Sequence, residues 1–444
     1  MFIASESLVT VGPPFLLDEG YVEEEFIAEG AASSYAPAGD LGADGRWTLE
    51  PDGQAEYRTR VLVRRPANAT DFSGVVLVEW LNVSGGLDAD PEFIALREEI
   101  VRQGHMWVGV SAQKIGVEGG PVLVEVDLPG MEVAGLGLKG LDPERYGSLT
   151  HPGDAYSFDI YTQVAAVIRG GTGPFADLQA SSVVAVGESQ SAFALVTYAN
   201  GVQPITGAFD GFFVHSRGAA SLPLQPETGM ADLAGSIGGA PVAIRDDSRV
   251  PVFIVQAESD VTGILASGRS RQPDTSTIRL WEVVGTAHQD RSNMGEMADF
   301  IDCGVPINDG PFHLVAKAAL RHLVRWVTDG TAPPEASRIE IGDVETLTIA
   351  RDPDGIALGG LRTPPVDVPA EVLSGTQGPS SEVFCLLLGS TTPLSTERFR
   401  ELYPTAGSYE DQYSTAVRES IEAGYILEDD RDAIESYARP EHVG

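Results

Sequence analysis

Ser189 stands in a Gly-x-Ser-x-small pattern at residues 187–191, which can place a serine for nucleophilic attack. An apolar, β-forming run precedes the pattern, and a helical pattern follows it. At such a strand-to-helix turn the serine hydroxyl stands clear of the sheet, close to the free amides that begin the helix. Gly187 allows a tight turn, while Ser191 replaces the usual second glycine and keeps that position small. The pattern predicts a nucleophile.

A serine hydroxyl is a weak nucleophile, so it needs an imidazole to remove its proton and a carboxylate to orient that imidazole. With this turn, the acid and then the histidine follow the serine, each just after a strand. Asp260 and Glu258 follow the apolar run at residues 250–257, and His288 ends a small-residue loop after the run at residues 277–284. We predict His288 as the base and Asp260 as its partner, with Glu258 as the alternative acid.

Each of these residues also has an ordinary structural interpretation. Ser189 fits a helix N-cap, Asp260 a turn and His288 a surface loop. Their occurrence together, in the required order and each behind an apolar strand pattern, favours a catalytic group over three independent structural roles.

The tetrahedral intermediate of such an attack needs two N–H donors for its oxyanion. The main-chain amide of Gln190 is one expected donor, because it directly follows the serine. The second is expected from the loop after the strand pattern at residues 74–81, where Asn82 or Val83 would supply a main-chain amide. The alternative is that this loop is an ordinary glycine turn into the next helix.

Two long insertions, at about residues 113–152 and 217–249, are expected to shape a substrate pocket as lids. Tyr146 and His151 lie in the first of them, and His215 follows an apolar strand end. We predict these three side chains in the substrate pocket. A structural hydrogen-bonding role is the alternative for His215 and for His151.

Several motifs together resemble a known family. The segments at residues 187–191, 258–260 and 285–288 look like those of an α/β-hydrolase. More narrowly, four segments resemble bacterial proteins usually called alpha/beta hydrolase domain-containing: residues 79–86, 145–154, 214–219 and 358–364. The resemblance covers nearly the whole chain, and it implies a serine hydrolase that acts on a carboxylic ester without naming the substrate.

Alternating strand and helix patterns favour a mostly parallel central sheet flanked by helices. The resemblance implies that this sheet belongs to an α/β-hydrolase fold. An antiparallel pair is predicted first, at residues 21–27 and 55–63. We predict a core over residues 1–335, which includes the two cap insertions, and a C-terminal extension over residues 336–444 packed on that core.

The composition restricts the partners of this chain. It has 65 acidic and 29 basic residues and a formal net charge of -36. Such a surface repels nucleic acid and anionic membranes and favours a neutral or cationic small molecule, here a small-molecule ester. Because the N-terminus lacks a basic region and no run has the ~20 apolar residues of a membrane span, we expect a soluble cytoplasmic protein. It would be secreted if a signal peptide has been removed.

Cys303 and Cys385 are the only two cysteines. They are either buried thiols, as in a cytoplasmic protein, or a disulfide that clamps the C-terminal part to the core.

These observations predict an esterase that forms an acyl-enzyme on Ser189, with His288 as base and then acid and Asp260 orienting it. This chemistry requires no metal and no organic cofactor. An acyltransferase with the same triad is one alternative, and a non-catalytic binding protein that keeps the fold is another.

Overall fold

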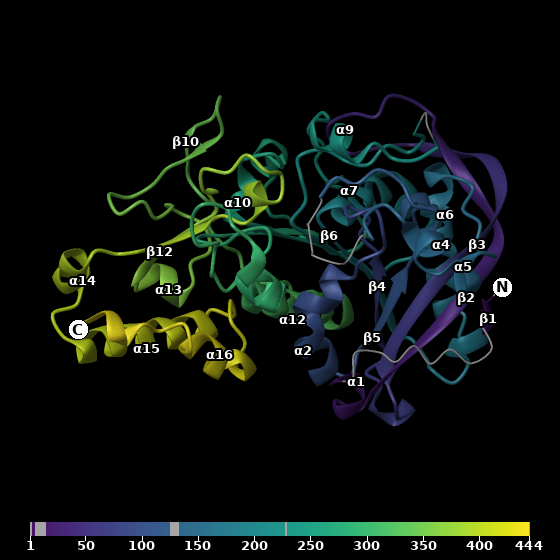
Figure 1. Ribbon diagram of the computed structural model, residues 1–444. Helices are drawn as coiled ribbons and strands as arrows, with labels where there is room; N and C mark the ends of the chain where they lie inside the picture. Colours follow the sequence, from purple (N-terminus) through teal and green to yellow (C-terminus); the bar gives the residue numbers. More distant parts are fainter. Residues whose placement is uncertain (1, 5–14, 125–132, 227–228, 444) are drawn as a thin grey trace. The chain divides into compact units, whose positions relative to one another are not determined.

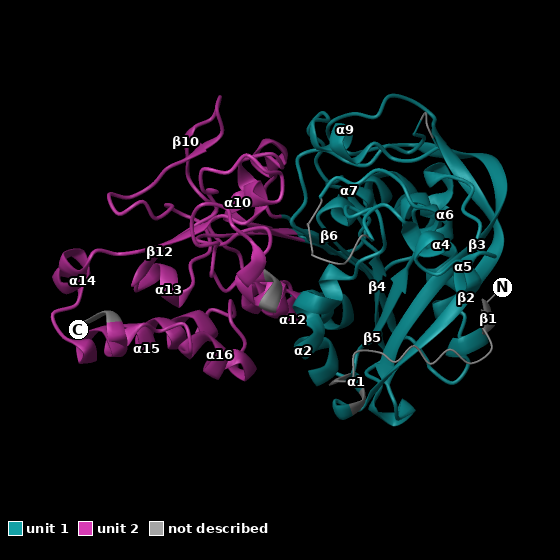
Figure 2. Ribbon diagram, in the orientation of Figure 1, with its two compact units in different colours: residues 1–253, 275–278, 323–331 teal, residues 254–274, 279–322, 332–444 magenta. Residues whose placement is uncertain are grey.

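The computed structural model describes residues 2–4, 15–124, 133–226 and 229–443. The chain divides into two compact units, coloured separately in Figure 2. Unit 1 comprises residues 1–253, 275–278 and 323–331, and unit 2 comprises residues 254–274, 279–322 and 332–444. Among the described residues, no helix has both the length and the apolar character that a bilayer span requires.

The main sheet has the strand order β1-β2-β3-β5-β4-β6-β7-β8-β9. Strands β1 to β6 are labelled in Figure 1. The strands are β1 (Phe2–Ala4), β2 (Tyr21–Pro37), β3 (Leu49–Pro66), β4 (Val75–Trp80), β5 (Met106–Val110), β6 (Ser182–Glu188), β7 (Gly211–His215), β8 (Val252–Ala257) and β9 (Ile278–Val283). Strand β4 pairs in parallel with β5 and β6, and β6 pairs in parallel with β7. Strands β1, β2 and β3 form antiparallel pairs, as do β3 and β5. The predicted α/β class with parallel central strands is confirmed.

Strands β2 and β3 are much longer than the predicted pair, at 17 and 18 residues. The first half of β3 is polar and largely exposed, so no apolar run marks it in the sequence. Cross-strand pairing with β2 maintains the ribbon there. Just beyond this half, Arg58 forms an ion pair with its β2 partner Glu29. A pair of this kind is recognisable only once both strands are known.

Three helices of unit 1 contact the central strands: α2 (Pro91–Arg102), α6 (Ser157–Arg169) and α7 (Gln190–Thr197). Helix α2 has a proline in its first turn, and α7 follows β6 directly. The side chains of β4, β5, β6 and β7 are all buried. This core supports the turn between β6 and α7.

The carboxylate of Glu79, at the end of β4, holds the start of helix α2. It accepts hydrogen bonds from the main-chain amides of Glu92 and Phe93, each at 3.0 Å, and from the indole N–H of Trp107 at 2.7 Å. Burial, and then the charges of Asp90 and Glu92, raise the pKa of Glu79 well above its ordinary value. Because β4 and α2 are joined in this way, both ends of the loop between them are fixed.

Each predicted insertion contains short helices. The first includes α3 (Lys114–Glu118), α4 (Gly137–Leu141) and α5 (Pro143–Tyr146), and the second includes α9 (Leu233–Ile237). Residues 125–132 of the first and residues 227–228 of the second lie outside the described residues. A role of either insertion as a lid stays a prediction.

Unit 2 has its own hydrophobic core. Val261 and Val284 pack there with apolar side chains from the C-terminal part of the chain: Ile339, Ile349, Ile356, Ala357, Val366 and Leu373. The C-terminal helices are α14 (Thr396–Leu402), α15 (Ala406–Glu422) and α16 (Arg431–Glu435). The C-terminal part therefore shares a core with residues on either side of β9, while the domain boundary near residue 335 stays a prediction.

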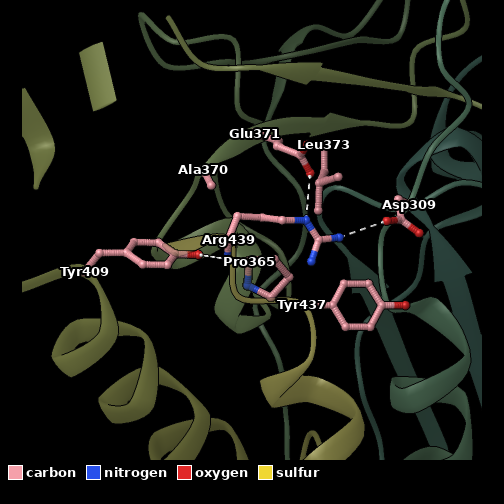
Figure 3. Close-up of a pocket in the computed structure, with 8 residues that line it drawn as sticks. All are labelled: Asp309, Pro365, Ala370, Glu371, Leu373, Tyr409, Tyr437 and Arg439. Atoms are coloured by element: carbon pink, nitrogen blue, oxygen red, sulfur yellow. Dashed lines mark hydrogen bonds and ion pairs between the residues drawn. The ribbon is translucent and has the colours of Figure 1, made fainter. Parts of the chain in front are cut away.

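Arg439 ties the end of the chain to unit 2 (Figure 3). Its guanidinium lies 3.2 Å from Asp309 and 3.9 Å from Glu371, and its main-chain amide donates to the hydroxyl of Tyr409 at 2.9 Å. The pocket beside it has a volume of about 10 Å³. That space suits about one water molecule, so it is too small for a substrate.

Cys303 and Cys385 form a disulfide within unit 2. The bond lies in a small buried cluster with Ala298, Ile307 and Leu388. Of the two interpretations of these cysteines, the structure therefore has the bonded one.

Replacing Cys303 and Cys385 together by serine is expected to lower the free energy of unfolding. The disulfide joins residues 82 apart in sequence, and closing a loop of that length in the unfolded chain contributes about 4.5 kcal/mol in the chain-entropy model. Urea unfolding of the oxidised wild type and the double variant measures the difference. Equal midpoints, or two free thiols in the mass of the unreduced wild type, would contradict the expectation.

Candidate active site

Ser189 occupies the turn between β6 and α7, and its backbone lies in a region that side chains rarely adopt, with φ 58° and ψ -120°. Its amide donates to the carbonyl of His215 at 3.0 Å, and its carbonyl accepts from the amide of Phe193 at 3.2 Å. The residue is partly exposed although its neighbours in β6 and α7 are buried. The predicted strand–turn–helix is confirmed, and such strain is characteristic of functional sites.

Small residues allow this turn to close. A Cβ atom at Gly187 would lie 3.0 Å from the Cβ of Ser191 and 3.1 Å from a methyl group of Leu195. Ser191 is fully buried in the first turn of α7. Close packing between positions 187 and 191 thus explains why the turn needs a glycine at the first and a small residue at the second.

Gln190 links the turn to the loop after β4. Its side-chain Oε1 accepts from the amide of Val83 at 3.2 Å, and its Nε2 donates to Oε1 of Gln113 at 2.6 Å. The indole of Trp80 donates to that same Gln113 oxygen at 2.9 Å. The main-chain amide of Gln190 begins α7 and has no acceptor among the described residues, as expected for an oxyanion donor.

The main-chain amides that we predicted as second donors are both engaged. The amide of Asn82 donates to the carbonyl of Ala89 at 2.9 Å, and that of Val83 donates to Gln190. The side chain of Asn82 accepts from the amide of Ser84 at 2.8 Å and donates to the carbonyl of Glu188 at 3.1 Å. The loop therefore contacts the residue before Ser189 through this side chain.

Two arginines of β3 anchor the same loop. Arg60 contacts Asp88 at 2.9 Å, and Ser111 donates to Asp88 as well. Arg64 forms an ion pair with Asp90. Sequence reasoning missed these arginines, because alternating charges in a strand look like an ordinary solvated face.

His215 ends β7 next to the turn, and Glu188 is its neighbour across the sheet. Its Nδ1 lies 3.3 Å from Oε2 of Glu92, and both side chains are buried. Burial raises the pKa of Glu92 well above its ordinary value. The placement of His215 beside Ser189 is compatible with the predicted pocket role, which stays a prediction.

Tyr146 and His151 each have protein partners within unit 1. The hydroxyl of Tyr146 donates to Glu25 at 2.7 Å. The Nε2 of His151 lies 2.8 Å from the carbonyl of Ala112, and its Nδ1 accepts from the amide of Gly153 at 3.2 Å. Burial lowers the pKa of His151. These contacts favour the structural alternative for His151, and pocket contacts by either residue stay predictions.

In unit 2, Asp260 and His288 form a buried pair. The Nδ1 of His288 lies 2.7 Å from Oδ1 of Asp260, and the other carboxylate oxygen accepts from the amide of Ala257 at 2.7 Å. The amide of His288 donates to Oγ of Ser259 at 2.7 Å. A carboxylate on Nδ1 favours the tautomer with a lone pair on Nε2, which is the form that a general base needs.

Glu258, the alternative acid, has other partners. Its Oε1 accepts from Arg351 at 2.6 Å and from the amide of Gly375 at 2.9 Å, while its Oε2 accepts from the amide of Gly285 at 2.8 Å. Asp260, and not Glu258, contacts His288. Glu258 instead holds together the loop that precedes His288 and the C-terminal part of the chain.

A second acid–histidine pair is formed by Asp290, two residues after His288, and His313. Oδ2 of Asp290 lies 2.7 Å from Nδ1 of His313, and its Oδ1 accepts from the amide of Asn293 at 2.8 Å. Burial would raise the pKa of Asp290, but the contacts with His313 and the hydrogen bond from the amide of Asn293 together outweigh it and lower the pKa. The pair fixes the segment after His288, and no local pattern marks it.

The predicted residues are divided between the two units. Ser189, Gln190, Asn82, Val83, His215, Tyr146 and His151 lie in unit 1, whereas Glu258, Asp260 and His288 lie in unit 2. Unit 1 also contains a cavity of about 340 Å³ at the amino ends of β7 and β8, lined by Phe209, Asp210 and Val250 among others. Ser189 follows the carboxyl end of β6. That cavity is therefore not formed by the candidate residues.

The chain matches a known protein family over nearly its whole length. A family model described as an alpha/beta hydrolase domain matches residues 4–436. A search of curated proteins found no match. A solved esterase from Rhizomucor miehei is 12% identical, with 68% of this chain and 85% of that chain covered and a TM-score of 0.33. Est1E from Butyrivibrio proteoclasticus is 10% identical, with 61% and 95% covered and a TM-score of 0.31.

Proposed function

We propose that this chain, which belongs to the alpha/beta hydrolase domain family, is a serine hydrolase that cleaves a carboxylic ester through an acyl-enzyme on Ser189. The observation that carries the proposal is the strained, partly exposed Ser189 at the β6–α7 turn, followed by the unengaged amide of Gln190. A serine in that conformation has its hydroxyl and an oxyanion donor at the same end of a parallel sheet.

The proposed chemistry has two halves. The Oγ of Ser189 bonds to the ester carbonyl carbon while its proton passes to Nε2 of His288. The tetrahedral intermediate then expels the alcohol, which takes that proton. Water attacks the acyl-enzyme in the same manner, releases the carboxylic acid and regenerates the serine. Asp260 keeps the imidazole in the required tautomer, and its 2.7 Å contact with Nδ1 of His288 supports this role.

Labelling with a fluorophosphonate tests the nucleophile. The expected result is one adduct by intact mass, located by peptide mapping on Ser189, and no adduct in Ser189→Ala. Ser191→Ala is a matched control two residues away, with a buried hydroxyl, and it should still label. An adduct on another residue, or none on the wild type, would overturn the proposal.

Hydrolysis is then separated from its alternatives with short p-nitrophenyl esters. Release of the free acid supports an esterase, and transfer of the acyl group to an added alcohol identifies an acyltransferase instead. A chain that neither labels nor turns over these esters is better explained as a binding protein with this fold.

A further inference from the structure

We infer that the side-chain amide of Asn82 donates the second hydrogen bond to the oxyanion, beside the main-chain amide of Gln190. This inference rests on the proposed function, because an oxyanion forms only when Ser189 attacks a carbonyl. It replaces the expected main-chain donor from the loop after β4 with a side chain of the same loop.

The first argument is that the amides of this loop are already engaged. Asn82 N–H donates to Ala89, Val83 N–H to the side chain of Gln190, and Ser84 N–H to Oδ1 of Asn82. Ala89 also donates back to the carbonyl of Asn82 at 2.8 Å, which closes a two-bond bridge. Turning one of these amides toward a substrate would break an existing hydrogen bond, which an efficient preorganised site avoids.

The second argument is that the orientation of the Asn82 carboxamide is fixed. Ser84 N–H can only donate, so the atom facing it must be the oxygen. The carbonyl of Glu188 can only accept, so the atom facing it must be the NH₂ group. One N–H of that group reaches Glu188, which is the one acceptor that Nδ2 has among the described residues, so its second N–H makes no hydrogen bond there. A buried donor of this kind is available for a ligand oxygen.

The third argument is position. Strands β4 and β6 are parallel, with Val75 opposite Ser182 and Glu79 opposite Val186. Continuing this register by three residues brings Asn82 level with Ser189. The carbonyl that holds the NH₂ group, at 3.1 Å, belongs to the residue directly before Ser189. The NH₂ group therefore lies against the residue that directly precedes the nucleophile, and Asn82 is buried.

In the attack step, the carbonyl π electrons move to the ester oxygen as the Ser189 Oγ bond forms. The resulting negative charge is stabilised by Asn82 Nδ2–H and by Gln190 N–H, and neither group loses its proton. When the carbonyl reforms, the alcohol leaves and both hydrogen bonds weaken. Both donors thus act mainly in the transition state, which is where binding energy raises kcat.

The test compares Asn82→Ala and Asn82→Asp with the wild type on a p-nitrophenyl ester. Loss of one oxyanion donor lowers kcat by roughly 10²- to 10³-fold, and we expect that loss in both variants with little change in KM. Asn82→Asp keeps an acceptor for Ser84 but removes the donor. Ser84→Ala is the matched control on the same loop, because its hydroxyl makes no hydrogen bond within the described residues. It should keep wild-type kcat.

A second measurement separates catalysis from a structural role. A trifluoromethyl ketone adds to the serine and puts an oxyanion in the hole, so its inhibition constant should weaken in Asn82→Ala by about the same factor as kcat. In Asn82→Asp, protonation restores an O–H donor. The ratio of its kcat/KM to that of the wild type should therefore rise as pH falls. A merely displaced loop would give no such rise.

Retention of kcat within about fivefold in Asn82→Ala, or a loss of kcat without a matching loss of ketone affinity, would overturn the inference. These outcomes differ from failure of the proposed function, which appears in the wild type as no label on Ser189 and no turnover. If the wild type labels and turns over while the Asn82 variants match it, only the inference about Asn82 is wrong.

Discussion

Replacing Ser189 by alanine is expected to lower kcat for an ester by roughly 10⁴- to 10⁶-fold, and His288→Ala is expected to do nearly the same. The two side chains form and break the same bonds, so the double variant should be no slower than either single variant. Steady-state hydrolysis of a p-nitrophenyl ester measures the three rates. The folded fraction of each variant is checked by thermal unfolding.

Ser216 provides a matched control for the effect of backbone strain. It is a serine with positive φ, 52°, that directly follows β7 and is fully buried. Ser216→Ala should therefore keep kcat within a few-fold of the wild type if Ser189 matters through its hydroxyl. Residual activity above about one hundredth in Ser189→Ala, or equal losses in both serine variants, would argue against nucleophilic catalysis by Ser189.

The second large effect is expected at Asp260 and not at Glu258. In Asp260→Asn the amide oxygen is expected to keep the hydrogen bond from the amide of Ala257, which leaves the NH₂ group facing Nδ1 of His288. That donor favours the wrong tautomer and should lower kcat by about 10⁴-fold. The free energy of unfolding of Asp260→Asn should fall less than that of Glu258→Gln, because asparagine has nearly the same shape as aspartate. The kcat and the urea midpoint of each variant are measured together.

Glu258→Gln should show the opposite pattern. Its carboxylate accepts from the partly exposed Arg351 and from two main-chain amides, and a hydrogen bond to a charged group contributes about 1.5–3 kcal/mol. We therefore expect a clear drop in the urea midpoint, with a much smaller fall in kcat than in Asp260→Asn. If Glu258→Gln abolishes activity while staying stable, and Asp260→Asn remains active, the assignment of the acid must be reversed.

Local features made part of this molecule predictable. The turn at Ser189 depends on an apolar strand, a glycine and a helix start, all within a few residues, and each leaves its own mark in the sequence. The pair of Asp260 and His288 was predictable for a similar reason, because each follows an apolar strand. The parallel centre of the sheet followed from the alternation of strands and helices.

The remaining features depend on residues far apart in the chain. No local signal indicates that Val83 donates to Gln190, or that Glu258 is held by Arg351 and Gly375. The amides of Asn82 and Val83 acquire their acceptors only when unit 1 has folded. The inference that a side chain is the second oxyanion donor depends on these contacts. The polar half of β3 likewise became a strand through pairing and not through its own propensity.

The interleaving of the two units has a consequence for how the protein is made. Unit 2 begins at residue 254, yet unit 1 is completed only by residues 323–331. Residue 331 therefore has to emerge from the ribosomal exit tunnel before unit 1 is complete. By then, the first segment of unit 2 has already emerged. Sequential folding, one finished unit after another, is the usual course for multidomain chains. Here the segments of the two units alternate along the chain, so neither unit can be completed before part of the other has been synthesised.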